Sequence, residues 1–230
     1  MKSSVAAESG DGPIRHSRAE TPTIITDSQE KARLESANSL RLTDRVKEMV
    51  LDALHGERPF RLRPSTLLDL NRCAIEGLDS YAGNWRPAGI GIEKSKHQPP
   101  GGHLVPELVE ELCDYVNDNW AQSSAINLSA VVMWRVNWIH PFTDGNGRTA
   151  RAASELVLNV RSGFFLPGVK AIPERILLRR VDYYGCLEDA DRRFGELGTL
   201  SDEVVCDLAS LLESMLALQL QDIHEKAAET

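Results

Sequence analysis

One continuous stretch in the second half of the chain decides the fold. Residues 126–139 read INLSAVVMWRVNWI, and residues 140–151 read HPFTDGNGRTAR. The first segment is apolar at nearly every position, and its polar exceptions are Asn127, Ser129, Arg135 and Asn137. A helix without a wide polar face belongs in the core of a protein. We therefore predict a buried central helix over 126–139 that leads directly into a polar loop.

The sequence on both sides of this centre predicts further helices. Asp27 and Ser65 are the expected N-caps of the first two. Residues 80–104 differ, because they are rich in Gly and Pro and hold Ile90 and Ile92 beside glycines, which predicts a loop with a short hairpin at about 87–96. The predicted fold is all-α with this one small β-hairpin, and its other helices cover 27–56, 65–77, 106–120, 148–161, 173–193 and 202–223.

Composition and charge set the class of protein. The 230 residues carry 26 Lys and Arg against 34 Asp and Glu, a formal net charge of −8, which weighs against binding nucleic acid through its phosphates. No run of about 18 apolar residues occurs, and the four separated cysteines lack metal or redox spacing. We expect a cytoplasmic protein without membrane contact. The polar composition of residues 1–21 predicts a flexible tail. The remaining sequence predicts one domain over 22–223.

The twelve residues after the central helix contain the groups that carry chemistry. Pro141 disfavours helical geometry at the residue before it, so the helix should end with His140 at its C-terminal edge. Two glycines around Asn146 allow a tight turn into the next helix, whose N-terminal amides form an anion site. His140 has an unperturbed pKa near neutrality, which suits a general base acting on a hydroxyl.

The charged residues of this loop predict a polyphosphate ligand. Arg148 and Arg151 stand three apart in the first turns of the next helix, so both side chains can lie beside the exposed amides. Asp144 offers an oxygen ligand for a magnesium ion that bridges phosphates. The pattern predicts a nucleoside triphosphate, Mg²⁺ and proton abstraction by His140, although the spacing does not say which phosphate is attacked. The alternative is an ordinary helix terminus and glycine turn.

Residues 140–151 resemble the signature of the Fic family, HPFx(D/E)GNGRxxR, at every defined position. The similarity covers about residues 24–220. It includes AGNWR at 82–86 and HQPP at 97–100, which flank the family's flap, and YYGCLEDAD at 183–191 in a downstream helix. The resemblance implies protein AMPylation, in which AMP passes from ATP to a Ser, Thr or Tyr hydroxyl of a target protein, or of the enzyme itself, and pyrophosphate is released.

The resemblance also implies a role for each loop residue. His140 would be the base, Asp144 would bind Mg²⁺, and Arg148 and Arg151 would neutralise the β- and γ-phosphates of ATP. The phosphates would rest on the turn, and Phe142 would anchor the loop in the core. The turn residues are Gly145, Asn146 and Gly147.

The hairpin at about 87–96 corresponds to the family's flap, which would align the target chain by strand addition. That mode of binding needs an exposed strand edge. Two glycines beside two isoleucines fit such an edge, and the residues concerned are Gly89, Ile90, Gly91 and Ile92. The alternative is a plain surface hairpin.

Regulation is where the sequence departs from the family. Many Fic proteins are inhibited by a helix with the motif [S/T]xxxE[G/N], whose glutamate pairs with the second arginine of the signature. This chain has no full match, and its candidate glutamates are Glu30, Glu35 and Glu203. The alternative for each is a helix cap region or a solvated helix face. If none inhibits, an antitoxin-like partner restrains the enzyme or it is constitutively active.

Three further alternatives stay open. The same site could remove AMP or transfer another phosphoryl-linked group, and the domain could instead bind a nucleotide or a partner without catalysis. The last helix carries an apolar stripe that either faces the core or forms the seam of a homodimer. The stripe consists of Val204, Leu208, Leu211, Met215 and Leu218.

Overall fold

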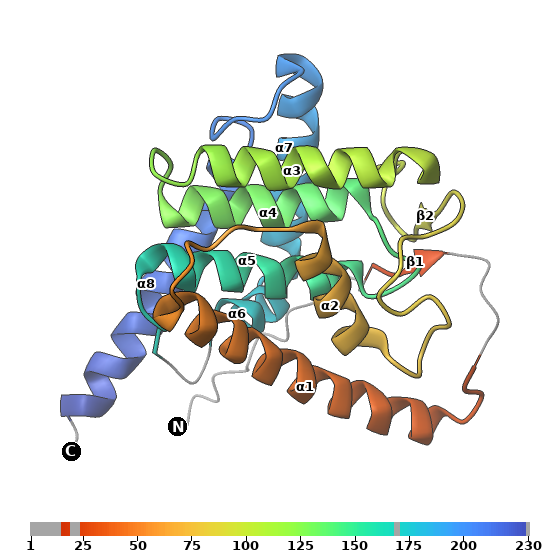
Figure 1. The fold of residues 1–230 in the computed structure, drawn as a ribbon, viewed down its shortest axis with the longest axis horizontal. Coiled ribbons are helices and arrows are strands. Elements are labelled where there is room, and N and C mark those ends of the chain that lie inside the picture. Colours follow the sequence, from red (N-terminus) through yellow and green to blue (C-terminus); the bar gives the residue numbers. More distant parts are fainter. Residues whose placement is uncertain (1–14, 19–23, 168–170, 229–230) are drawn as a thin grey trace, which may run out of the picture.

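The computed structural model describes residues 15–18, 24–167 and 171–228, and these are mainly helical (Figure 1). This confirms the predicted all-α class. The elements in chain order are β1 Ser17–Arg18, α1 Ser28–His55, α2 Pro64–Ile75, β2 Gly91–Ile92, the 3-10 turn η1 Gly102–Leu104, α3 Val105–Asp118, α4 Ala125–Ile139, α5 Asn146–Ser162, α6 Ile172–Leu178, α7 Arg180–Leu197 and α8 Cys206–Ala228.

The central helix α4 is enclosed by other helices, as its sequence predicts. It packs most extensively against α5 and also contacts α3, α7 and α8. Trp134 and Met133 are each 1% exposed, and a buried side chain of this kind contributes about 1.5–3 kcal/mol relative to an exposed one. Ser124 caps the helix, because its Oγ accepts a hydrogen bond from Asn127 N at 3.1 Å. The core therefore fixes the end of α4 from which the polar loop departs.

Most helix boundaries follow the predictions, with three corrections. Asp27 caps α1 as expected, since its Oδ1 accepts from Gln29 N and Glu30 N. Ser65 is not the cap of α2, which begins one residue earlier at Pro64, where the missing N–H of proline needs no acceptor. The single helix predicted over 173–193 is two helices, α6 and α7, separated at Arg179. The last helix begins at Cys206 rather than at residue 202.

The predicted hairpin is corrected by the structure, because β2 has a partner far away in sequence. β2 pairs antiparallel with β1, so that Ser17 lies opposite Ile92 and Arg18 opposite Gly91. Edge strands present unpaired backbone groups that another extended segment can satisfy. Residues 15–18 are therefore not part of the flexible tail predicted for 1–21, and residues 1–14 and 19–21 lie outside the described residues.

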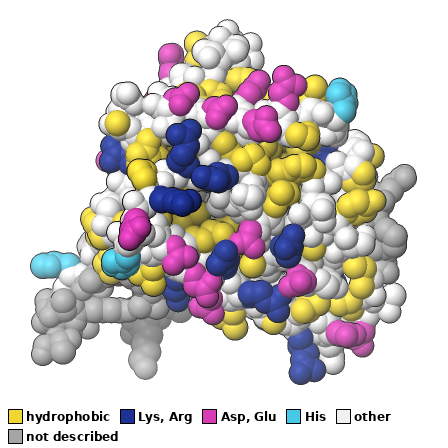
Figure 2. All heavy atoms as spheres, viewed as in Figure 1, with side chains coloured by type: hydrophobic (Ala, Val, Ile, Leu, Met, Phe, Trp, Pro, Cys, Tyr) yellow, Lys and Arg dark blue, Asp and Glu magenta, His cyan; other side chains and the backbone are white. Residues whose placement is uncertain are grey.

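The apolar stripe predicted for the last helix faces the core. Val204, just before α8, and Leu208, Leu211 and Met215 within it are at most 8% exposed, while Leu218 is 45% exposed, so the core-facing alternative is confirmed for those four. On the face viewed in Figure 1, acidic and basic side chains are interspersed and form no continuous basic surface (Figure 2). No helix in the described part of the chain combines the length and hydrophobicity needed to cross a membrane.

Candidate functional site

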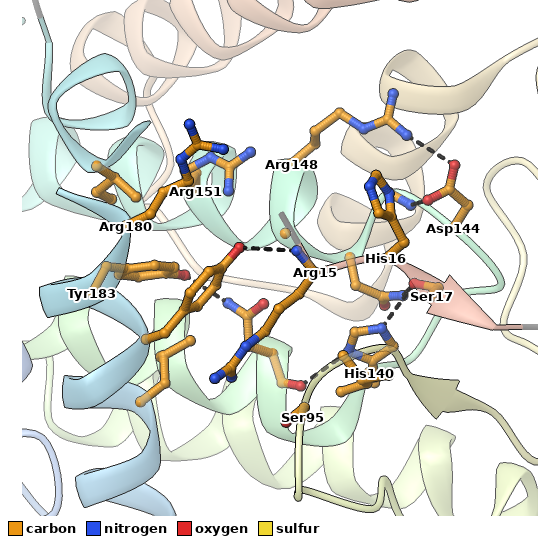
Figure 3. A pocket seen from close by; sticks show the side chains of 18 of the residues that line it. Arg15, His16, Ser17, Ser95, His140, Asp144, Arg148, Arg151, Arg180 and Tyr183 are labelled. Atoms are coloured by element: carbon orange, nitrogen blue, oxygen red, sulfur yellow. Dashed lines mark hydrogen bonds and ion pairs between the residues drawn. The ribbon is translucent and has the colours of Figure 1, made fainter. Parts of the chain in front are cut away.

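A cavity of about 430 Å³ lies over the N-terminus of α5 (Figure 3). Side chains from α1, α4, α5, α6, α7 and the 15–18 segment border it. The structure brings together here every residue of the polar loop that the sequence singled out for chemistry. These are His140, Asp144, Gly145, Asn146, Gly147, Arg148 and Arg151.

The backbone of His140 is held in an unusual conformation at the end of α4. Its φ of 51° and ψ of 57° lie in the left-handed region, which costs a non-glycine residue about 1–2 kcal/mol. The buried guanidinium of Arg86 stabilises this turn: Nε donates to His140 O at 2.8 Å, and Nη2 donates to Ile139 O at 3.3 Å. Nη1 of Arg86 also donates to Ala88 O at 2.7 Å. One side chain thus ties the end of α4 to the base of the flap.

The imidazole of His140 has a defined tautomer. Nδ1 lies 3.2 Å from Asn137 O, and since a carbonyl oxygen only accepts, Nδ1 carries the hydrogen. Burial lowers the pKa of His140 to about 4, so the ring is neutral at physiological pH and Nε2 presents a lone pair. Ser17 Oγ lies 2.9 Å from Nε2 and donates to it. This is the geometry of a general base with a hydroxyl in reach.

The lowered pKa of His140 predicts an outcome that NMR can measure. Titration of the histidine ring signals should show one imidazole with a midpoint near pH 4, because protonation would place a charge in a desolvated site. Comparison with His140→Gln, which removes that signal alone, provides the assignment. A midpoint near the ordinary histidine value of about 6.5 would contradict the proposed burial of the neutral ring.

The turn into α5 requires glycine at position 145. Gly145 has a φ of 77°, and a Cβ there would lie 2.6 Å from Ile75 Cγ2. The first amide bonded within the helix is that of Thr149, which donates to Gly145 O at 2.8 Å. The preceding amides, those of Gly147 and Arg148 among them, are the N-terminal donors of a helix, which favour an anion.

Two amide side chains hold this loop in shape, and neither role was foreseen from the sequence. Asn146 Oδ1 accepts from Phe142 N at 2.9 Å, and Asn146 Nδ2 donates to Phe142 O at 2.8 Å. Asn71, which is fully buried, donates from Nδ2 to Asp144 O at 3.0 Å and accepts from Gly83 N at 3.1 Å. The Asn146 side chain therefore closes the loop, and its Nδ2 also reaches the cavity.

The charged residues of the site differ in their partners. Asp144 Oδ2 pairs with Arg148 Nη2 at 3.0 Å, and Asp144 Oδ1 accepts from Gly145 N at 2.6 Å. Arg151 has no carboxylate within ion-pair distance among residues 15–18, 24–167 and 171–228, and burial lowers its pKa. In Figure 3 Arg151 and Arg180 lie on one side of the cavity and Asp144 on the other. An unpaired cation in a partly desolvated cavity favours an anionic ligand.

Comparison with known proteins finds one matching family model. The model described as Fic/DOC matches residues 61–158, which include the polar loop. This chain therefore contains a region that is similar to the Fic/DOC family. Its Fic region is 32% identical over 127 residues to the protein adenylyltransferase fic-1 of Caenorhabditis briggsae, and 34% identical over 127 residues to the protein adenylyltransferase Fic of Drosophila willistoni. Each match covers 54% of this chain, but the chain spans only about a quarter of those relatives, 23% and 24%.

Solved structures show that the Fic fold extends over most of the chain. A Fic domain containing signaling protein from Bacteroides thetaiotaomicron superimposes with a TM-score of 0.63 at 21% identity, covering 82% of this chain and 71% of that protein. Fic-1 from Caenorhabditis elegans superimposes with a TM-score of 0.62 at 22% identity, covering 88% and 55%. The helices outside residues 61–158 therefore belong to the same fold.

The structure places some of the remaining predicted residues at the cavity and others away from it. Of the flap residues, Gly91 and Ile92 form β2 and Ile92 borders the cavity, whereas Gly89 and Ile90 lie outside the strand. Among the candidate inhibitory residues, Glu35 on α1 borders the cavity together with both loop arginines. Glu30 and Glu203 are exposed and do not border it.

Proposed function

We propose that this Fic domain is a protein adenylyltransferase that transfers AMP from ATP to a protein hydroxyl and releases pyrophosphate. The observation that carries the proposal is the neutral Nε2 of His140 facing a hydroxyl oxygen at 2.9 Å, beside the N-terminus of α5. The curated relatives are named protein adenylyltransferases, which supports the same activity for this chain.

The residues of the site suggest how the transfer proceeds. His140 Nε2 takes the proton of the acceptor hydroxyl, and the oxygen attacks the α-phosphorus of ATP while the bond to the β-phosphate breaks. The leaving pyrophosphate carries the electron pair of that bond. Arg148, Arg151 and the amides at the start of α5 stabilise this charge, as preorganised donors do in phosphoryl transfer.

Asp144 fits a magnesium ion that is held mainly by the nucleotide. Its carboxylate is 49% exposed and borders the cavity, and within the described ranges no cluster of three or more His, Cys, Asp or Glu side chains could hold a metal alone. Mg²⁺ commonly binds one or two carboxylates together with substrate phosphates. Asp144 would supply such an oxygen, and the ion would add positive charge beside the phosphates.

The edge of β2 supports the proposal that a target chain docks by strand addition. β2 already forms a backbone ladder with an extended segment, and this ladder places a hydroxyl against His140. Backbone hydrogen bonds supply affinity in this mode of recognition without demanding a particular side chain. A target protein would occupy the edge in place of β1.

The proposal is tested with two differently labelled ATP molecules. The purified protein is incubated with cell lysate and ATP labelled at the α- or the γ-phosphate, and labelled proteins are detected on a gel. Transfer of AMP labels proteins from α-labelled ATP alone. Labelling from γ-labelled ATP would indicate phosphate transfer, and loss of label from pre-AMPylated protein would indicate removal of AMP. If wild type and His140→Ala gave the same amount of labelled protein, the label would not depend on the proposed base, and the alternative of a domain without catalysis would remain.

Glu35 is the candidate whose removal should change activity. We expect Glu35→Gly to raise the rate of AMP transfer, because a carboxylate that borders the same cavity as Arg148 and Arg151 adds negative charge that opposes the binding of phosphates. Glu30→Gly and Glu203→Gly are matched controls, since both side chains are exposed outside the cavity. Initial rates with α-labelled ATP provide the measurement. Equal rates in all three variants and wild type would eliminate inhibition by these glutamates.

A further inference from the structure

The segment 15–18 lies where an acceptor protein would bind. β1 pairs in register with β2, and the ladder continues through Glu93 N, which donates to His16 O at 2.9 Å. Both His16 and Ser17 border the cavity, but His16 is exposed, whereas Ser17 is half-buried and its hydroxyl contacts His140.

The hydroxyl of Ser17 has the contacts of a nucleophile. It donates to His140 Nε2 at 2.9 Å and accepts from Asn146 Nδ2 at 3.3 Å. A hydroxyl oxygen has two lone pairs, so one remains for attack. In Figure 3 Ser17 lies directly above His140 and beside the loop that carries Asp144. The hydroxyl is thus placed between the base and the start of α5.

Arg15 anchors the segment on the opposite wall of the cavity. Its guanidinium carbon lies 4.2 Å from the centre of the Tyr184 ring, and its Nη2 pairs with Glu188 Oε1 at 2.5 Å. Its backbone N also donates to the Tyr184 hydroxyl at 3.3 Å. A cation over an aromatic face adds about 0.5–1 kcal/mol at an exposed site and more when desolvated. These contacts hold the segment in addition to the strand pairing.

The segment borders the cavity without filling it. Arg15, His16 and Ser17 are part of its wall, and about 430 Å³ remains with them in place. Ligand sites in proteins commonly measure about 300–1,000 Å³. Nucleotide and Ser17 can therefore occupy the site together.

We infer that Ser17 is a self-AMPylation site, modified by the His140 of the same chain; this inference rests on the proposed adenylyltransferase function. The Ser17 Oγ–Pα bond forms as the bond from Pα to the bridging oxygen of the β-phosphate breaks. The Ser17 proton passes to His140 Nε2, and pyrophosphate leaves with the electron pair. Because the acceptor is held by its own chain, it has a high effective concentration at the base.

Intact-mass measurement and peptide mapping of the full chain with ATP and Mg²⁺ test this inference. We expect one added AMP on the peptide that holds Ser17, lost in His140→Ala and reduced at least about tenfold in Ser17→Ala, since an intramolecular acceptor has no equal replacement. Ser17→Thr keeps a hydroxyl and should retain modification. Ser36→Ala, which removes an exposed hydroxyl of α1 outside the cavity, is the matched control. The series is repeated in Glu35→Gly so that inhibition cannot mask transfer.

Two further readouts separate this inference from the proposed function. In a mixture with a size-tagged His140→Ala chain, wild type should label itself with a half-time independent of dilution and leave the inactive copy largely unlabelled; equal labelling of both would overturn modification in cis. Lysate proteins labelled in a His140-dependent way without AMP on Ser17 would overturn the inference and leave the function standing. If neither Ser17 nor any lysate protein is labelled by wild type or by the Glu35→Gly variant, both the Ser17 inference and the proposed adenylyltransferase function are overturned.

Discussion

Replacing His140 with Ala is expected to lower the rate of AMP transfer by about 10²–10⁴-fold, the usual contribution of a general base. The neutral Nε2 of this residue is 2.9 Å from a hydroxyl oxygen, and its tautomer is fixed by the bond from Nδ1 to Asn137 O. The cations and amides of the phosphate site lie on α5 and do not depend on the imidazole. ATP should therefore still bind to the variant.

Two measurements on the same samples check this expectation. Initial rates of AMP incorporation from α-labelled ATP report transfer, and isothermal titration calorimetry reports the Kd for ATP with Mg²⁺. His55→Ala is the control, because His55 is exposed at the end of α1 and does not border the cavity. A His140→Ala variant with the wild-type transfer rate would overturn the role of base.

Replacing Arg151 with Ala should lower the transfer rate by about 10²–10³-fold, as loss of one preorganised charge-stabilising donor does. This arginine has no carboxylate partner among the residues that the structure describes, whereas Arg148 is paired with Asp144. Its charge is therefore held for a ligand, and its removal should weaken ATP binding as well. Arg151→Lys keeps the charge but loses the planar fork, so it should lie between Ala and wild type.

Thermal unfolding separates this effect from misfolding. Removing an unpaired, partly buried cation should leave Tm unchanged or raise it, because the cost of desolvating the charge is lost. Arg192→Ala, which removes an arginine on the exposed face of α7 paired with Glu196, should change neither rate nor Tm. A wild-type transfer rate in Arg151→Ala would show that the phosphates are neutralised elsewhere.

The central helix and its loop could be predicted because their signals are local. The apolar run of residues 126–139 is long enough to identify a buried helix, and Pro141 and Gly145 determine where the chain turns. The grouping of His140 with Arg148 and Arg151 follows from the same geometry, since His140 ends α4 and the two arginines lie in the first turns of α5, just after the loop. These residues are together in the structure as their spacing indicates.

The contacts made by distant segments could not be predicted from such patterns. The sequence includes Arg86 in the AGNWR stretch but does not indicate its hydrogen bonds to Ile139 O and His140 O, because these depend on how the base of the flap packs against α4. The pairing of β1 with β2 joins Ser17 to Ile92 and Arg18 to Gly91, which are 75 and 73 positions apart, and two-residue strands carry no period to detect. The bend at Arg179 that separates α6 from α7 has no Gly or Pro to mark it.

The antiparallel pairing at β2 would also give the proposed enzyme a rule for accepting substrates. Because the ladder is made of backbone groups, it does not read the neighbouring side chains, but a shift of one residue turns each side chain to the opposite face. In the proposed mode of docking, an acceptor hydroxyl opposite Ile92 would meet the base as Ser17 does, and a shift of one residue would turn that hydroxyl toward the opposite face. Selection would therefore follow the parity of the strand, so unrelated sequences that share only an extended segment with a hydroxyl in the correct frame would be modified at the same site.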